Sequence, residues 1–238
     1  MPPLSIISPS RRKGCEQRSR RYTDDVIRCA ITDGSRVGDT AEARRAGLLA
    51  DAVRWSELGI DFVQLREKTL SAGELVQLTR AMMAVFCENG GTTKLLVNGR
   101  ADIALAAGAD GVHLTSAPDE LTSKQVRQLF ARAGRKNPVV GVSCHSVAEV
   151  ERARNAGVDF ILFGPVFEKR ISGSLVSEGV GLDALRDATA AGTATPVLAL
   201  GGIDEGNAAL CIDVGAAGIA GIRLFSKSRT LQFRTGSR

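Results

Sequence analysis

The segment LAAGADGVHL (residues 105–114) runs from an alanine-rich stretch through a glycine and an acidic residue into a short apolar run. The same order recurs in ARNAGVDFIL (153–162) and, with a small residue in the acidic place, in CIDVGAAGIA (211–220). Glycine is common directly after a helix, because it adopts the left-handed backbone conformation there without strain. Each copy therefore predicts a helix that ends at the glycine and a strand that follows. Such an internal repeat favours a barrel of alternating strands and helices.

Eight short apolar segments rich in Val, Ile and Leu alternate with longer amphipathic or alanine-rich segments. The predicted strands cover residues 27–32, 61–66, 94–98, 111–114, 139–143, 160–164, 196–200 and 218–222. The predicted helices cover residues 40–59, 71–90, 100–107, 122–133, 146–156, 181–191 and 204–214. This pattern predicts an α/β protein with the (β/α)8 TIM-barrel fold as a single domain, whereas a doubly wound sheet more often has five or six strands.

The barrel is predicted to occupy residues 26–225, between two basic ends. Residues 1–25 form a basic N-terminal extension that we expect to be disordered, and residues 226–238 form a short basic C-terminal tail. The net charge of +5 comes largely from these ends, and no aromatic residue lies among the basic residues of 11–21. That composition favours solvated arms over a nucleic-acid-binding surface, so no nucleic-acid partner is expected.

The composition is typical of a soluble globular protein, with 44% hydrophobic and 24% charged residues in a chain of 238. No apolar run reaches the roughly 18–20 residues of a membrane span, and the N-terminus lacks the residue order of a signal peptide. We therefore expect a cytoplasmic protein without a membrane partner. Five cysteines without a CxxC pair favour reduced, buried thiols over disulfides or a zinc site. The sequence leaves a homo-oligomer open.

Polar residues gather directly after the predicted strands, where TIM barrels have their active sites. Gly201 and Gly202 follow the seventh strand and Gly221 ends the eighth, where barrels commonly bind a phosphate through backbone N–H groups. The alternative is that these glycines only permit tight turns.

The exits of the second and third strands carry further donors. Gln64 and Arg66 share one face of the second strand and are expected to point into the barrel, whereas Glu67 faces away. Arg66, Lys68 and Asn98 could bind a second anionic group of a substrate. Each cation could instead serve as a salt-bridge partner.

The two histidines of the chain both stand near strand ends. His145 follows the fifth strand, where an imidazole that titrates near neutral pH could move a proton in a bound ring. A structural role in the turn is the alternative. His113 lies within an apolar run and is expected to be a core or supporting residue.

Six motifs resemble the family of thiamin phosphate synthase and its paralogue, thiazole tautomerase (TenI-like). They are VQLREK (63–68), VNGRADIALAAGADGVHL (97–114), GVSCHS (141–146), DFILFGPVFE (159–168), PVLALGGI (196–203) and AAGIAGI (216–222). The resemblance covers residues 26 to 225 and implies a (β/α)8 barrel that binds a thiazole phosphate as its small-molecule substrate.

The two branches of this family differ at the strand exits. The synthase condenses a pyrimidine pyrophosphate with a thiazole phosphate and uses Mg²⁺ held by aspartates after strands three and four. Here the corresponding places read Asn98-Gly99-Arg100 and His113-Leu-Thr-Ser, so the motifs offer no carboxylate. The tautomerase similarly carries N-G-R, a histidine after strand five and F-E, which match Asn98-Gly99-Arg100, His145 and Phe167-Glu168.

These departures favour a metal-independent tautomerase, which is an isomerase, without a cofactor. The resemblance implies that His145 is its catalytic acid/base, that Glu168 orients or shares the proton, and that Gly201, Gly202 and Gly221 bind the phosphate. Arg223, which replaces a small hydroxylated residue of relatives, could bind the phosphate or block the pocket.

Two alternatives stay open. One is a synthase, a transferase, with a Mg²⁺ site remodelled around Glu67 or Asp102, since Lys68 is the synthase's lysine. The other is a non-catalytic barrel that binds a phosphate ligand as a regulatory protein.

Overall fold

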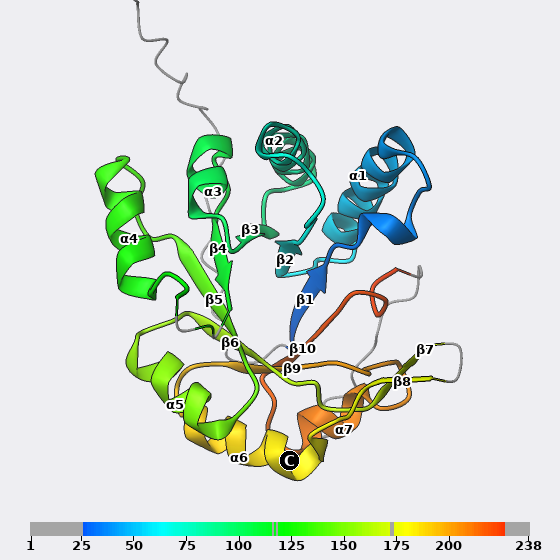
Figure 1. Ribbon diagram of the computed structural model, residues 1–238, viewed down its shortest axis with the longest axis vertical. Coiled ribbons are helices and arrows are strands. Elements are labelled where there is room, and N and C mark those ends of the chain that lie inside the picture. The colour runs from blue at the N-terminus through cyan, green and yellow to red at the C-terminus, as the bar shows by residue number, and fades with distance from the viewer. Residues whose placement is uncertain (1–25, 116, 118, 172–173, 227–238) are drawn as a thin grey trace, which may run out of the picture.

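The protein folds as a closed barrel of parallel strands with helices around it, as Figure 1 shows. The structure, a computed structural model, describes residues 26–115, 117, 119–171 and 174–226. The predicted single-domain TIM barrel is confirmed. The expected N-terminal extension (1–25) and nearly all of the C-terminal tail lie outside the described residues.

The barrel strands agree with the predicted ranges to within one residue at each end. They are β1 (Ile27–Ile31), β2 (Phe62–Leu65), β3 (Lys94–Asn98), β4 (Gly111–Leu114), β5 (Val139–Cys144), β6 (Phe160–Phe163), β9 (Val197–Leu200) and β10 (Gly218–Gly221). Around the barrel they follow the order β1-β10-β9-β6-β5-β4-β3-β2. All neighbouring pairs are parallel, so the C-terminal ends of the strands meet at one rim.

The helices described around the barrel are α1 (Ala41–Glu57), α2 (Ala72–Glu88), α3 (Ala101–Ala107), α4 (Ser123–Arg132), α5 (Val147–Asn155), α6 (Gly181–Gly192) and α7 (Ala208–Asp213). A side chain caps the first turn of four of them, α1, α2, α4 and α5. Thr40 caps α1, and Ser71 forms a capping box with Glu74 at α2. α7 starts later than predicted, because the Asp204 side chain accepts the N–H groups of Gly206 and Asn207 and holds a turn there.

Two small elements at the rim were not predicted. The 3-10 turn η1 (Gly34–Arg36) follows β1, and β7 (Lys169–Ile171) pairs with β8 (Ser174–Ser177) as an antiparallel hairpin after β6. Strands of three and four residues are too short to produce a recognisable alternation in the sequence.

The repeated helix-to-strand link has the geometry that the sequence predicts. Its three glycines, Gly108, Gly157 and Gly215, have φ angles of +80°, +71° and +105°. The acidic residue of the link has a structural role that the sequence did not reveal. Its carboxylate accepts a backbone N–H of the preceding strand in two copies, Asp110 from Leu95 and Asp159 from Val140. Asp61, which follows Gly59 in a similar link before β2, accepts the N–H of Arg28.

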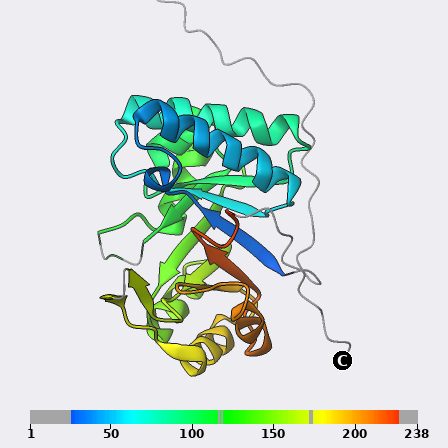
Figure 2. The same cartoon turned by 90° about the vertical axis from the view of Figure 1, so that its right-hand side faces the viewer.

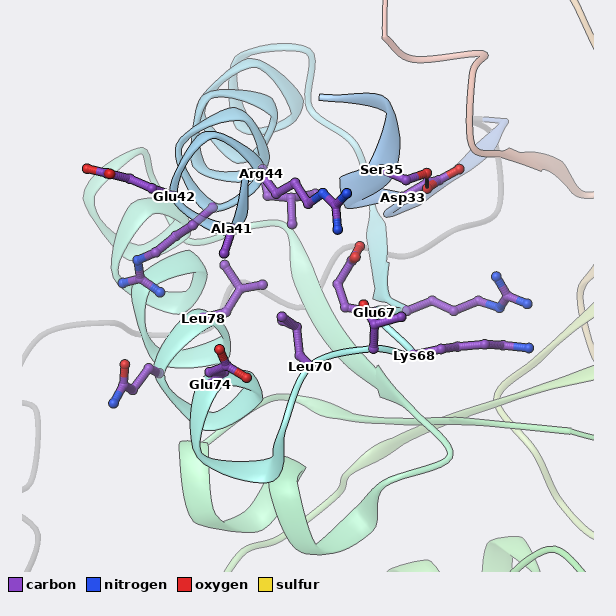
Figure 3. Close-up of a pocket in the computed structure, with 15 residues that line it drawn as sticks. Asp33, Ser35, Ala41, Glu42, Arg44, Glu67, Lys68, Leu70, Glu74 and Leu78 are labelled. Atoms are coloured by element: carbon purple, nitrogen blue, oxygen red, sulfur yellow. Dashed lines mark hydrogen bonds between the residues drawn. The ribbon is translucent and has the colours of Figure 1, made fainter. Parts of the chain in front are cut away.

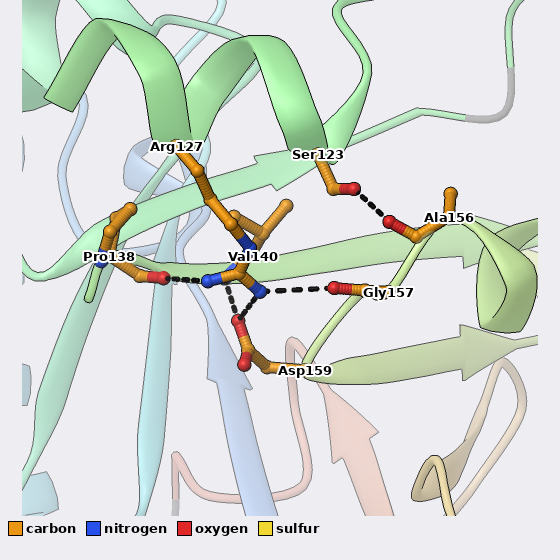
Figure 4. A network of polar contacts seen from close by, with 7 residues as sticks. All are labelled: Ser123, Arg127, Pro138, Val140, Ala156, Gly157 and Asp159. Atoms are coloured by element: carbon orange, nitrogen blue, oxygen red, sulfur yellow. Dashed lines mark hydrogen bonds and ion pairs between the residues drawn. The ribbon is translucent and has the colours of Figure 1, made fainter. Parts of the chain in front are cut away.

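Figure 4 shows this link around Asp159 at the start of β6. Asp159 Oδ2 accepts the Val140 N–H at 2.7 Å and pairs with Arg127 Nη2 at 2.9 Å. Arg127 also donates to the carbonyls of Pro138 and Gly157 at 3.1 and 3.0 Å. The carboxylate thus joins β5, β6 and α4 at the N-terminal end of the barrel, opposite the rim.

Apolar side chains pack in two layers, inside the barrel and between strands and helices. Figure 2 shows α1 and α2 side by side along one side of the barrel, where they cover the outer layer. The inner layer contains Ile27, Cys29, Ile31, Phe62, Leu96, Phe160, Leu162, Leu198 and Ala220. Phe62 and Phe160 stack inside the barrel with ring centroids 4.6 Å apart.

Two further predictions concern buried cysteines and membrane-spanning helices. The described cysteines are free, and Cys29, Cys144 and Cys211 are buried as expected, whereas Cys87 is exposed. Within the described part of the chain, no helix is long and apolar enough to cross a membrane.

Candidate functional site

A layer of polar side chains lies inside the barrel, near the C-terminal ends of β2 to β5. The Gln64 amide donates to Asn98 Oδ1 at 2.6 Å, and Gln64 is buried. His113 Nε2 lies 2.9 Å from Ser143 Oγ. We call this polar layer, which lies just below the rim, the floor. The structure places Gln64 and Asn98 next to each other in the floor and adds Ser143 to it.

His113 is a buried, neutral residue of this floor, which confirms its expected supporting role. Only 1% of its surface is exposed, and burial lowers its pKa to about 3. Its Nδ1 atom has no hydrogen-bond partner among the described residues. Gly141 leaves room for the ring, because a Cβ at that position would lie 2.7 Å from His113 Nδ1.

His145 stands at the rim between β5 and β6. Its Nδ1 lies 2.5 Å from the carbonyl oxygen of Gly164. A carbonyl only accepts hydrogen bonds, so Nδ1 carries the proton and the neutral ring keeps its lone pair on Nε2. This arrangement fixes the tautomer of His145 and leaves Nε2 as the atom that can accept a proton.

The carboxylate next to His145 is that of Glu149, in the first turn of α5. Glu149 Oε2 accepts the backbone N–H of His145 at 2.5 Å, and Ser146 caps the same helix. The sequence prediction missed Glu149, although the spacing Ser146-x-x-Glu149 is that of a capping box and could have indicated it. Between described residues, the backbone N–H of His145 donates to Glu149 and its ring contacts Gly164. The role of Glu168 stays a prediction.

Arg66, Glu67 and Lys68 form the rim above β2, in the wall of a pocket of about 730 Å³ between the starts of α1 and α2. In Figure 3, the Glu67 carboxylate points to the turn that contains Asp33 and Ser35, and Lys68 extends away from α1 and α2. Glu67 thus faces away from the barrel interior, as predicted. Three leucines, Leu48, Leu70 and Leu78, supply the apolar part of the pocket.

The glycine-rich exits of β9 and β10 are adjacent, since Leu200 pairs with Ala220. Gly201 and Gly202 have φ angles of +95° and +65°. A Cβ on Gly202 would lie 2.7 Å from the carbonyl oxygen of Phe167, so the loop after β6 requires this glycine. Close packing therefore explains the glycine pair at least in part, and phosphate binding there stays a prediction.

Backbone donors are nevertheless available at this place. The N–H groups of Gly202, Ile203 and Arg223 make no hydrogen bond within the described residues. The Arg223 side chain is exposed, and Arg36 of η1 approaches the carbonyl of Ile222 at 3.5 Å. Arg223 follows β10 in the chain and the Arg36 guanidinium reaches the same segment, which suits an anionic group.

The synthase branch implies Mg²⁺, and the residues present do not fit it well. Gly99, with φ of +61°, occupies the place of an aspartate. Glu120 supplies one carboxylate there, as its Oε2 lies 3.4 Å from the Thr115 N–H and 3.6 Å from a Cβ built on Gly99. Asp102 is paired with Arg100 at 2.7 Å. The described residues contain no group of three or more His, Cys, Asp or Glu that could hold a metal ion.

Comparison with known proteins gives consistent matches over the barrel. The model of a family described as thiamine monophosphate synthase (TMP-TENI) matches residues 29–225. A Geobacter sulfurreducens protein, named as a candidate thiamine-phosphate synthase, is 44% identical over 68% of this chain and 71% of its own. The thiamine-phosphate synthase of Chlorobium luteolum is 39% identical over 72% and 76% of the two chains.

A solved structure agrees with these matches. The thiamine phosphate pyrophosphorylase of Pyrococcus furiosus superposes with a TM-score of 0.68 at 25% identity, covering 87% of this chain and 90% of its own. The names of these relatives support the synthase alternative, and none of them supports the expected tautomerase.

Proposed function

The chain belongs to the thiamine monophosphate synthase family, and from that premise we propose that it is an enzyme that condenses a pyrimidine pyrophosphate with a thiazole phosphate. The observation that carries this proposal is the 44% identity to a relative named for that activity. The retained cations Arg66 and Lys68 support it, because the reaction needs a site for the pyrophosphate group.

In this proposal, the chain's residues divide into a floor and two anion sites. Gln64 and Asn98, joined at 2.6 Å, bind the pyrimidine ring edge through their remaining amide donors and acceptors. Arg66 and Lys68 bind the pyrophosphate. The N–H groups of Gly202 and neighbouring residues, together with Arg223, bind the thiazole phosphate.

The reaction breaks the bond between the pyrimidine methylene carbon and the pyrophosphate oxygen, and joins that carbon to the thiazole nitrogen. Negative charge develops on the leaving pyrophosphate, so fixed cations beside it lower the activation barrier of the reaction. Arg66 and Lys68 have that role here. No step through a metal ion is proposed, since the described residues contain no group of three or more His, Cys, Asp or Glu that could hold one.

A thiazole tautomerase is the second candidate, because His145 has the geometry of an acid/base. The contact of its Nδ1 with the Gly164 carbonyl leaves Nε2 to accept a proton from a ring carbon and return it elsewhere on the ring. Gly99 and Phe167-Glu168 match the tautomerase motifs and favour the same candidate.

One set of incubations separates these candidates. The purified protein is mixed with thiazole phosphate and pyrimidine pyrophosphate, with and without Mg²⁺, and pyrophosphate release is measured. In parallel, the thiazole carboxylate phosphate alone is followed for isomerisation. Pyrophosphate release that depends on both substrates supports the synthase, whereas isomerisation without it overturns the synthase in favour of the tautomerase.

A third outcome is binding without turnover of either kind, which would indicate a non-catalytic barrel. His145→Ala distinguishes the two enzymes further. Loss of a general acid/base costs about 10²- to 10⁴-fold in rate, so the tautomerase predicts such a loss, while the synthase as proposed predicts a small change.

A further inference from the structure

The rim segments after β1 and β2 are fastened together by two hydrogen bonds that cross in opposite directions. The Arg66 N–H donates to Thr32 Oγ1 at 2.9 Å. The Gly34 N–H donates to both oxygens of the Glu67 carboxylate, at 3.0 and 3.1 Å. We name these four residues the β1–β2 clasp. Thr32 is 1% exposed, so its end of the clasp is shielded from water.

The clasp determines where the Glu67 carboxylate lies. Glu67 stands between Arg66 and Lys68 in the sequence, and a free carboxylate there could pair with either cation. Bound to the Gly34 N–H, it points toward the turn after β1, whereas Lys68 extends away from α1 and α2 (Figure 3). The carboxylate is thus directed away from Lys68.

Gly34 is matched to this arrangement. A Cβ at position 34 would lie 2.7 Å from Glu67 Oε2, so any other residue would displace the carboxylate. Gly34 has no left-handed φ angle, and its backbone would therefore accept alanine without strain. The space for Glu67 is what requires glycine here.

We infer that Glu67 is a positioning residue that keeps Arg66 and Lys68 available for the diphosphate end of a substrate. This inference rests on the proposed synthase function and extends it to a residue outside the anion site. The clasp fixes the backbone at Arg66 through Thr32 and removes the competing carboxylate through Gly34. Both effects preorganise the cations before an anion arrives.

Inorganic pyrophosphate is the probe that tests this inference. We expect Gly34→Ala, which displaces the carboxylate but keeps its charge, to raise the Kd for pyrophosphate about tenfold, measured by calorimetry on folded protein. Adding Glu67→Ala to this variant removes the displaced carboxylate, so the double variant should bind pyrophosphate at least as tightly as wild type. The KM for pyrimidine pyrophosphate should rise in parallel with the Kd.

Glu74→Ala is the matched control, because Glu74 lines the same pocket but caps α2 through Ser71. It should lower thermal stability without changing the pyrophosphate Kd. A purely structural role for Glu67 predicts the same behaviour for Gly34→Ala, and an unchanged Kd in that variant would overturn the inference. A Kd that stays about tenfold higher after Glu67→Ala is added would also overturn it, because no carboxylate is then left to compete.

Failure of the proposed function is a separate result. Wild-type protein that neither binds pyrophosphate nor releases it from substrates would refute the synthase. Wild-type protein that does both, with unaltered affinity in Gly34→Ala, would refute only the role of the clasp.

Discussion

Replacing Asp159 with alanine tests the hydrogen bond that joins β5 and β6 at the N-terminal end of the barrel. Asp159 accepts the N–H of Val140, a residue with 0% exposure, so the variant leaves a buried donor without its carboxylate partner. An unsatisfied buried donor costs about 1–3 kcal/mol. The ion pair with Arg127 has side chains 37% and 42% exposed and adds only about 0–1 kcal/mol.

The expected loss for Asp159→Ala is therefore about 1–4 kcal/mol in the free energy of unfolding. For a domain of this size, that corresponds to a fall in Tm of about 2–16 °C. Arg127 keeps its hydrogen bonds to Pro138 and Gly157, so the helix α4 should stay in place.

Urea unfolding followed by circular dichroism measures this loss, with Asp159→Asn as the matched control. Asparagine keeps an acceptor oxygen for Val140 and removes the charge, so it should lose less than about 1 kcal/mol. Equal losses in both variants would refute the reasoning, since the charge would then matter and the buried N–H would not. A loss below about 0.5 kcal/mol for Asp159→Ala would refute it as well.

Three further predictions concern single residues. Burial lowers the pKa of His113 to about 3, so the folded state resists protonation that the unfolded state accepts below about pH 6.5. The free energy of unfolding should therefore decline as pH falls from about 6.5 toward 3, by at most about 1.4 kcal/mol per pH unit for this group. His113→Gln should make the dependence of stability on pH less steep. Parallel pH dependences of variant and wild type would contradict this prediction. Ala217 lies directly before β10, at the position that an aspartate occupies before β4 and β6. Ala217→Asp should accept the Val197 N–H and so raise the free energy of unfolding in urea by about 0.5–1.5 kcal/mol. Destabilisation would contradict the equivalence of these positions. A Cβ on Gly202 meets Phe167, so Gly202→Ala should lower the Tm by several degrees, as calorimetry would detect, while an unchanged Tm would mean that the loop after β6 yields.

The sequence predicted the strands and most helices because their signals are local. The apolar runs, the capping Thr40 and Ser71 and the glycine at each helix end lie within the elements that they define. Two elements differ from the prediction. The start of α7 is set by a turn that the Asp204 side chain holds. The strands of the β7–β8 hairpin are too short to produce a periodic pattern.

The contacts within the candidate site were less predictable, because they depend on the register between strands. Gln64 meets Asn98, and His113 meets Ser143, across about thirty residues of sequence that carry no signal of the pairing. The order of the predicted strands placed these residues at the rim. The hydrogen-bond partner of each side chain became clear only from the closed barrel. Glu149 and Glu120 were missed although their contacts are local, to the backbone of His145 and Thr115 in the same strand exits.

The position of a carboxylate along the strand-and-helix repeat separates two structural roles. Carboxylates before a strand, such as Asp159, hold neighbouring strands at the base of the barrel. Glu67, Glu120 and Glu149 follow strands, and each accepts a backbone N–H at the rim: those of Gly34, Thr115 and His145. The backbone donors fix the direction of these three carboxylates, each of which keeps its negative charge. Glu67 points to the turn after β1 and Lys68 extends away from α1 and α2, so the structure separates two opposite charges that are adjacent in the sequence.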